Sequence, residues 1–264
     1  MNKGKILAGL DVGHVNTKAV IMRGQEILGY CIVPTGFNVV AAAQTALNQT
    51  LDKVGISRGE LAGIVATGIF KDMIYDVPPL NATKNVLEYV ADAKGALFLN
   101  KNSRTVIDIG GNVCKVIHYD QNGDVLDVIY NDKCADGLGI FYAAMAKALG
   151  LSEQEMSELA LKSTNDISIA IQCAVSAESE VVTLMCEGMD VADIANAILK
   201  FITERVAAMC TYIPPAKEIV VAGSLAKSKA LIKHLSSLMK QDVSALDIPE
   251  YVGAIGAVVT SYEG

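Results

Sequence analysis

Residues 7–22, LAGLDVGHVNTKAVIM, decide the fold, because they predict two strands joined by a tight turn. Asp11 and Gly13 lie in this turn, and the second strand begins at Asn16-Thr17-Lys18. Glycine lets backbone N–H groups approach an anion closely, so the turn can cradle a phosphate. A carboxylate repels a bare phosphate, so we expect Asp11 to hold hydrated Mg²⁺. An ordinary hairpin is the alternative, since Asp-x-Gly turns are common.

A second version of this pattern lies 97 residues further along the chain, in VIDIGGNVCKVI at 106–117. The matched positions are Asp11 with Asp108, Gly13 with Gly110, and Lys18 with Lys115. A single such turn indicates phosphate binding only weakly. Two of them at matched positions predict two related halves that face each other across a nucleotide cleft.

The composition favours a large globular protein without a nucleic-acid or membrane partner. Of its 264 residues, 52% are hydrophobic and 19% are charged, which suffices for two lobes with substantial cores. A net charge of −7 without a basic cluster argues against binding to nucleic acid or to an anionic membrane. No apolar run approaches the ~20 residues of a spanning helix, and residues 1–4 lead into a strand rather than a signal peptide. We therefore expect a cytoplasmic protein.

Hydrophobic periodicity predicts an α/β chain with an internal repeat. Besides the two hairpins, we expect strands at 26–33, 61–67, 125–130, 218–222 and 243–246, and helices at 39–54, 83–97, 139–149, 152–161, 176–186, 191–212, 225–239 and 251–262. Ser152 and Glu155 form a capping box, and Ile213-Pro214-Pro215 ends the longest helix. The polar stretch 100–104 separates the two predicted lobes. The first lobe is 1–104, closed by the C-terminal helix 251–264, and the second is 105–250.

Two glycine-containing segments near the end of the chain suggest further roles. A strand ends at Gly223-Ser224, and the helix expected from Leu225 would present N–H groups and positive dipole to a nucleotide. A strand-to-helix turn without a ligand is the alternative reading. Residues 253–257, GAIGA, indicate close helix packing, at an interlobe hinge or within one lobe.

Six cysteines in a reducing compartment are free thiols or ligands rather than disulfides. Cys134 and Cys173 each precede an expected helix, where the dipole favours the thiolate that ligates iron. They are half of the four ligands of an iron–sulfur cluster, and a two-fold dimer would supply the other half. Their 39-residue spacing fits no local zinc or ferredoxin pattern, so buried or idle thiols remain the alternative. The other four cysteines lie within strand or helix patterns and are read as structural.

The two Asp-x-Gly turns, with residues 220–224, resemble the two-lobed actin-like ATPase fold of sugar kinases, heat-shock chaperones and actin, whose halves are ribonuclease H-like. Across essentially its whole length the chain also resembles one family. This family contains the ATP-dependent activators of 2-hydroxyacyl-CoA dehydratases and the ATPase subunits of benzoyl-CoA reductase (BadF/BadG/BcrA/BcrD type). The matching segments are Gly9-Leu10-Asp11-Val12-Gly13 with Lys18, 106–111, Asn131-Asp132-Lys133-Cys134-Ala135, and Ala177-Glu178-Ser179-Glu180 after Cys173.

This resemblance implies a homodimeric, oxygen-sensitive ATPase from an anaerobic metabolism. Cys134 and Cys173 would share one 4Fe–4S cluster between two subunits, and Asp11 and Asp108 would hold Mg²⁺ through water. ATP binding and hydrolysis would drive a low-potential electron into a partner iron–sulfur reductase or dehydratase. A ferredoxin or flavodoxin would reduce the cluster.

The resemblance also assigns nucleotide contacts, and Asn112 is expected to orient the attacking water. The residues expected to contact ATP or ADP are Gly13, His14, Val15, Asn16, Thr17, Lys18, Gly110, Gly111, Gly137, Gly223 and Ser224. Asp11, Asp108 and Asn112 form the expected catalytic set.

Several positions depart from the family pattern. Gly-Gly-Gln-Asp is usual where this chain has Gly110-Gly111-Asn112-Val113, which removes a carboxylate and shortens an amide near the γ-phosphate. Asp136, Leu138 and Ile140 replace Ala, Thr and Arg after Cys134. We therefore expect slow hydrolysis. A small-molecule kinase of the same fold and a nucleotide-binding regulator without turnover are the rival functions.

Overall fold

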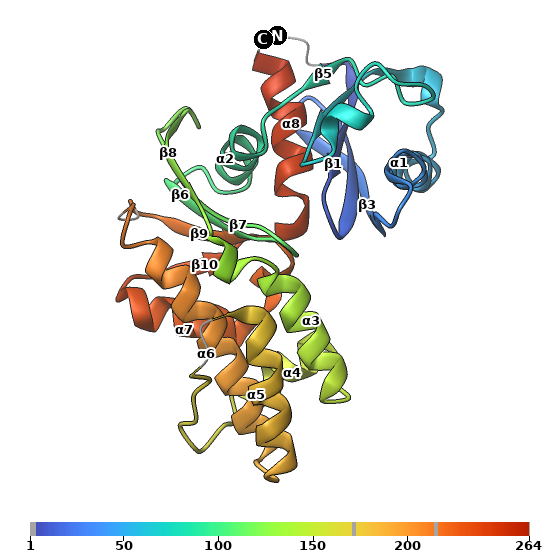
Figure 1. Ribbon diagram of the computed structural model, residues 1–264. Helices are drawn as coiled ribbons and strands as arrows, with labels where there is room; N and C mark the ends of the chain where they lie inside the picture. Colours follow the sequence, from blue (N-terminus) through green and yellow to red (C-terminus); the bar gives the residue numbers. More distant parts are fainter. Residues whose placement is uncertain (1–3, 171–172, 214–215, 264) are drawn as a thin grey trace. The chain divides into compact units, whose positions relative to one another are not determined.

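The structure is a computed structural model that describes residues 4–170, 173–213 and 216–263 (Figure 1). Two five-stranded sheets carry the fold, ordered β3-β2-β1-β4-β5 and β8-β7-β6-β9-β10. The strands are β1 (Ile6–Val12), β2 (Asn16–Arg23), β3 (Glu26–Pro34), β4 (Leu61–Thr67), β5 (Lys84–Asn85), β6 (Thr105–Ile109), β7 (Cys114–Tyr119), β8 (Val125–Tyr130), β9 (Ile219–Ala222) and β10 (Val243–Ala245). The helices are α1 (Val39–Val54), α2 (Glu88–Leu99), α3 (Leu138–Ala148), α4 (Glu153–Ala160), α5 (Ala174–Cys186), α6 (Val191–Met209), α7 (Lys229–Met239) and α8 (Val252–Glu263).

The internal repeat extends to strand direction. β1 runs antiparallel to β2 and parallel to β4, and β6 runs antiparallel to β7 and parallel to β9. Three consecutive strands, followed by two strands on the other side of the first, therefore occur twice. The predicted α/β class and repeated halves are confirmed.

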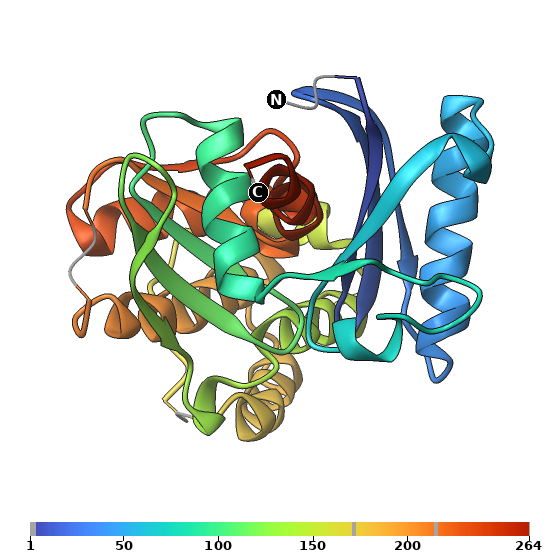
Figure 2. The ribbon, with the colours of Figure 1, turned by 90° about the horizontal axis from the view of Figure 1, so that it is seen from above.

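One compact unit comprises Met1–Arg104, Tyr119–Leu126 and Glu250–Gly264. In its sheet, α1 lies against one face and α8 against the other, with α2 packed on α8 (Figure 2). The α2–α8 crossing depends on two glycines, because a Cβ on Gly95 would overlap the carbonyl of Val252 and one on Gly256 that of Ala91. The close packing expected of 253–257 is therefore present inside this unit.

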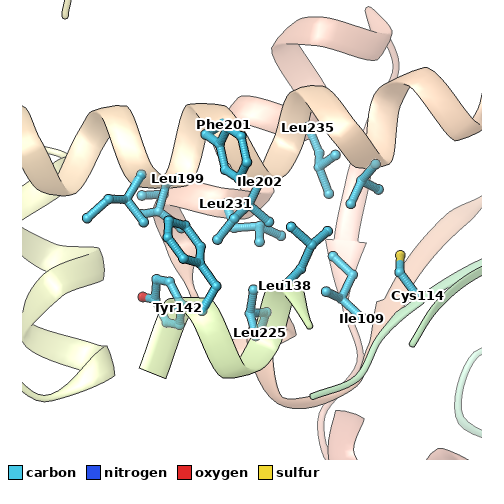
Figure 3. Packing of buried hydrophobic residues seen from close by; sticks show 14 of the residues in the cluster. Ile109, Cys114, Leu138, Tyr142, Leu199, Phe201, Ile202, Leu225, Leu231 and Leu235 are labelled. Atoms are coloured by element: carbon cyan, nitrogen blue, oxygen red, sulfur yellow. The ribbon is translucent and has the colours of Figure 1, made fainter. Parts of the chain in front are cut away.

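The second unit comprises Thr105–His118 and Asp127–Pro249. Its core forms where α6 packs on α4 and α7 and where α3 and α5 adjoin it. Figure 3 shows Phe201 and Ile202 of α6 among Leu231, Leu138 and Tyr142. All five side chains are almost completely buried. Ala135, next to Cys134, and Ala174, next to Cys173, both belong to this core.

Three expected helices have different limits, and each has a local cause. Residues 83–97 were expected to be one helix, but β5 pairs with β4, so α2 begins only at Glu88. Residues 225–239 divide into a 3₁₀ turn, Ser224–Lys227, and α7, because Ser228 caps α7 by accepting from Leu231 N–H. The helix expected over 191–212 ends at Met209, and the two prolines of the predicted breaker, 214 and 215, lie outside the described residues.

The capping box predicted at Ser152 and Glu155 is confirmed. Ser152 Oγ accepts from Glu155 N–H at 3.2 Å, and Glu155 Oε2 accepts from Ser152 N–H at 2.8 Å. Within the described ranges, none of the helices is both long enough and apolar enough to cross a bilayer.

Candidate functional site

The first Asp-x-Gly turn joins β1 to β2. Asp11 pairs with Lys18 across the hairpin, with Lys18 Nζ 2.9 Å from Asp11 Oδ2. Gly13 N–H donates to Asn16 O at 3.2 Å, which closes the turn. His14 and Val15 stand exposed at the tip, where the His14 ring meets Phe70 edge to face. This tip is open to a ligand.

Thr35, which was not predicted from the sequence, is hydrogen-bonded to several residues of this turn. Its hydroxyl donates to Gly13 O at 2.8 Å and lies 2.9 Å from the Thr17 hydroxyl, while its N–H donates to Val15 O. Thr35 is 3% exposed. A threonine just past the end of a predicted strand carries no sequence signal for this role.

The second turn, between β6 and β7, repeats the first. Lys115 Nζ lies 3.1 Å from Asp108 Oδ2, and Gly110 N–H donates to Val113 O at 3.0 Å. The amides of Gly13 and Gly110 are thus both engaged inside their own turns. Glycine serves the close turn itself at both sites, and a phosphate would bind to other groups there.

Each aspartate also lies against a glycine from the parallel neighbouring strand. Gly68 follows β4 with φ +90°, and a Cβ on it would lie 2.7 Å from Asp11 Oδ1. Gly223 follows β9 with φ +86°, and a Cβ on it would lie 2.9 Å from Asp108 Oδ1. Both positions therefore require glycine, for backbone conformation and for space. Each carboxylate therefore lies close to the backbone of a neighbouring strand end on one side and next to a lysine on the other.

Asp92 of α2 is a second carboxylate near Asp11 that the sequence analysis missed. A Cβ on Gly253 of α8 would lie 3.2 Å from Asp92 Oδ1 and 3.4 Å from Asp11 Oδ2. Asp92 is only 6% exposed. Carboxylate oxygens are the ligands that Mg²⁺ prefers, so the donor chemistry around both turns suits that ion.

The start of α3 is seated on the second turn. Gly137, the N-cap residue, donates its N–H to Asn112 O at 2.8 Å, and Ile140 N–H donates to Gly111 O at 3.0 Å. A Cβ on Gly139 would lie 2.5 Å from Gly110 O. Asn112 and Gly111 therefore have their carbonyls bound to the helix, while the expected contact residue Gly137 supplies the link.

Cys134 lies in a 3₁₀ turn, Lys133–Ala135, and α3 begins after it at Leu138. Cys134 therefore precedes a helix, as expected, but it does not stand at the helix start, because Gly137 in the left-handed conformation separates the two. Its side chain is outside the described part of the structure. Its neighbour Ala135 donates its N–H to Asp132 Oδ1 at 3.1 Å, which closes the turn.

Cys173 is the N-cap residue of α5, as the sequence predicted. Two carboxylates accept hydrogen bonds from the segment before Cys173, and Asp193 of α6 accepts most of them. Its Oδ1 accepts from Ser163 Oγ and from the N–H groups of Thr164 and Asn165 at 2.8–3.0 Å, and Asn165 Nδ2 donates to Oδ2 at 2.7 Å. These hydrogen bonds, led by those from Asn165, lower the pKa of Asp193 to about 2. Glu180 of α5 further accepts from Ala170 N–H.

Two of the remaining four cysteines are buried, and the other two are at least partly exposed. Burial raises the pKa of Cys114, and it raises the pKa of Cys210 to about 11. Cys31 Sγ donates to Gln49 Oε1 at 3.0 Å, and Cys186 is exposed at the end of α5. Among the described side chains, no three or more His, Cys, Asp or Glu residues gather into a metal site. Two cysteines per chain are half of a four-thiolate donor set, so the set fits a cluster only when two chains contribute.

Gly223 and Ser224 do not stand at an α-helix start. Ser224 opens the 3₁₀ turn, with α7 starting five residues later at Lys229. The dipole argument for a nucleotide contact at Ser224 was therefore wrong. Gly223 instead contacts the second turn, as described above.

Comparison with known proteins defines the class of protein to which these two matched turns belong. Residues 8–261 match the model of the BadF/BadG/BcrA/BcrD ATPase family, and the chain belongs to that family. It is 32% identical to the activator of lactoyl-CoA dehydratase from Anaerotignum propionicum, over 97% of this chain and 96% of the relative. It is 31% identical to the (R)-2-hydroxyglutaryl-CoA dehydratase activating ATPase of Acidaminococcus fermentans, with the same coverage of both chains.

Solved structures agree. The activator of the 2-hydroxyisocaproyl-CoA dehydratase from Clostridium difficile, with bound ADPNP, superposes with a TM-score of 0.90 at 30% identity, covering 98% of this chain and 94% of that one. A ROK family glucokinase from Streptomyces griseus has a TM-score of 0.63 at 13% identity, covering 98% of this chain and 100% of that one. The second likeness shows the fold alone, which is the fold of actin-like ATPases and sugar kinases.

Proposed function

We propose that the chain is a homodimeric ATPase that couples ATP binding and hydrolysis to electron transfer into a partner iron–sulfur reductase or dehydratase. One observation carries the proposal. The second Asp-x-Gly turn is hydrogen-bonded directly to the segment that bears Cys134, so a nucleotide turn and a ligand cysteine belong to one packed unit. Family membership and relatives named as activators support it.

The nucleotide would bind as its magnesium complex. Asp11 and Asp108 would hold hydrated Mg²⁺, which would supply positive charge to the phosphates when it is bound. Lys18 and Lys115 orient these carboxylates through their ion pairs. Asn112, through its amide, orients the water that attacks the γ-phosphate. The exposed tip of the first turn, His14 to Asn16, would contact phosphate, as would Gly111 of the second turn, whereas the N–H of Gly137 is already bound to Asn112 O.

Cys134 and Cys173 would hold one 4Fe–4S cluster per two chains. This group supplies one-electron chemistry when it is bound, and a ferredoxin or flavodoxin is the class of donor that would reduce it. The chain's part is to present two thiolates from loops supported by the α3–α7 core. Because one chain has half of the donor set, the cluster itself requires the dimer.

Anaerobic preparation with iron counting and electron paramagnetic resonance tests this function. We expect four irons per two chains, a dimer in solution, and ATP turnover that rises when a partner reductase is present. An iron-free dimer that still hydrolyses ATP would contradict the electron-transfer function. ATP binding without turnover, with or without a reductase, would instead indicate a nucleotide-binding regulator.

A further inference from the structure

Asn131 joins the nucleotide turn to the Cys134 segment. Its Oδ1 accepts from Cys114 N–H at 2.7 Å, and its own N–H donates to Cys114 O at 3.1 Å. Its Nδ2 donates to Asp136 Oδ1 at 2.6 Å and to Asp132 O at 3.0 Å. One side chain therefore fastens the first residue of β7 to positions before and after Cys134.

A second set of contacts closes the same loop from the other end. Asn112 O accepts from Gly137 N–H and Gly111 O accepts from Ile140 N–H. Gly139 leaves no room between helix and turn, since a Cβ on it would be 2.7 Å from the Cα of Gly111. The stretch 131–140 is thus tied to 111–114 at both of its ends.

Groups linked in this way are expected to be coupled, because a shift of one strains the hydrogen bonds and contacts that join it to the other. A displacement of Asn112 or Gly111 on nucleotide binding would carry the Cys134 turn with it. The same coupling would reach Asp132 and Asp136, because the side-chain amide of Asn131 donates a hydrogen bond to each. The second half contains this link entirely, so it needs no other part of the chain.

We propose that Asn131 is a positioning residue that transmits the state of the second nucleotide turn to the Cys134 segment. The inference rests on the proposed function, because it takes the turn to bind nucleotide. It names the residue and the hydrogen bonds through which nucleotide binding would reach the Cys134 segment. Energetic coupling of this kind is reciprocal, so a change at the Cys134 segment also alters nucleotide affinity.

Hydrogen exchange measured by mass spectrometry tests this link without using electron-transfer activity. The full chain, prepared anaerobically, is compared with and without Mg-ADPNP. In the parent, Mg-ADPNP should slow exchange in 110–114 and in 131–140 alike. In Asn131→Ala, slowing in 110–114 should remain, while slowing in 131–136 should fall by about fivefold, the factor expected for one hydrogen bond.

Two further variants sharpen the result. Asn131→Asp keeps the acceptor for Cys114 N–H but replaces the donor to Asp136, so it should lose the effect at 131–136 while folding normally. Asn196→Ala removes a side-chain hydrogen bond to His234 in the same unit and should behave as the parent. Iron release to a chelator provides a second readout: Mg-ADPNP should change its rate in the parent and should change it less in both Asn131 variants.

Calorimetry of Mg-ADPNP binding separates the possible failures. Normal binding to the parent with unchanged exchange at 131–140 would overturn this inference and leave the proposed function intact. Parental exchange behaviour in both Asn131 variants would show that Asn131 is not the link. No binding of Mg-ADPNP to the parent would overturn the proposed function, and this inference with it.

Discussion

Lys115 Nζ lies 3.1 Å from Asp108 Oδ2, with the two side chains 5% and 17% exposed. The matching Lys18–Asp11 pair is 2.9 Å apart, but Lys18 is 19% exposed. The same ion pair therefore occurs in two environments. Removing an ion-pair partner costs more where the remaining charge is buried, because water cannot replace the lost interaction there.

This difference predicts unequal stability losses. Asp108→Asn should lower the free energy of unfolding by about 3 kcal/mol, and Asp11→Asn by about 1 kcal/mol. Urea unfolding of both variants in the absence of nucleotide measures this. Equal losses would mean that burial of the lysine does not control the energy of the pair.

Nucleotide binding is predicted to depend on both aspartates. Asp11→Asn and Asp108→Asn should each weaken Mg-ATP binding at least about tenfold, because each removes a charge that holds the hydrated ion. Iron content should stay at the parental level. Calorimetry with Mg-ATP and an iron assay measure the two effects, and Asp127→Asn, on the exposed strand β8, is the matched control. If Asp108→Asn binds Mg-ATP with parental affinity, Asp108 does not help to hold the ion.

Four cysteine variants test the assignment of Cys134 and Cys173 as cluster ligands. Cys134→Ser and Cys173→Ser should each lose the iron, because a serine hydroxyl is a poor replacement for thiolate. Cys186→Ser and Cys210→Ser should keep it, since Cys186 lies at the far end of α5 and Cys210 is buried with a pKa of about 11. Full iron content in Cys173→Ser would remove that residue from the ligand set.

The rate of hydrolysis is predicted to be limited at Asn112 and Val113. Asparagine is one methylene shorter than the glutamine usual there, and an error of about 1 Å in a positioned nucleophile can cost ~100-fold. Asn112→Gln with Val113→Asp should raise steady-state turnover about tenfold or more without tightening ATP binding, as expected for a gain confined to the transition state. A correctly folded double variant no faster than the parent would point to another limiting step.

Asp193 should contribute stability that depends on pH. Its pKa in the folded protein, about 2, lies below the usual value of 3.8. The contribution is therefore complete above pH 4 and is lost as pH falls toward 2. Asp193→Asn should be less stable than the parent at pH 7, and the gap should narrow between pH 4 and pH 2. Urea midpoints at several pH values measure the gap, and a constant gap would contradict this assignment.

Much of the fold was predictable because local patterns agree with it. Alternation and turn residues located both hairpins, and α1 was predicted with its limits, since Asn38 caps its start and Gly55 its end. The start of α2 was missed because β5 gains its hydrogen bonds from β4, a partner distant in sequence. The short turn at Ser224 was missed although Ser228, a good N-cap residue, was readable from the sequence.

The site was predictable only where residues act within one hairpin. Asp11 with Lys18 and Asp108 with Lys115 follow from the repeat, because an antiparallel register brings such residues opposite each other. Gly68, Thr35 and Asp92 could not be found in this way. Each meets the first turn from another element, and a side chain's role there depends on tertiary approach rather than on its neighbours in sequence.

The two halves differ most between their third and fourth strands. The first half has α1 at this position, with a short 3₁₀ turn (Arg58–Glu60) after it, whereas the second half has α3, α4, α5 and α6, with Cys134 and Cys173 between β8 and β9. The two cysteines proposed as cluster ligands thus lie within a single insertion relative to the first half of this duplicated fold. A descendant could shed that insertion and keep both Asp-x-Gly hairpins. Conversely, an engineer could graft it onto another protein of this fold at the same junction.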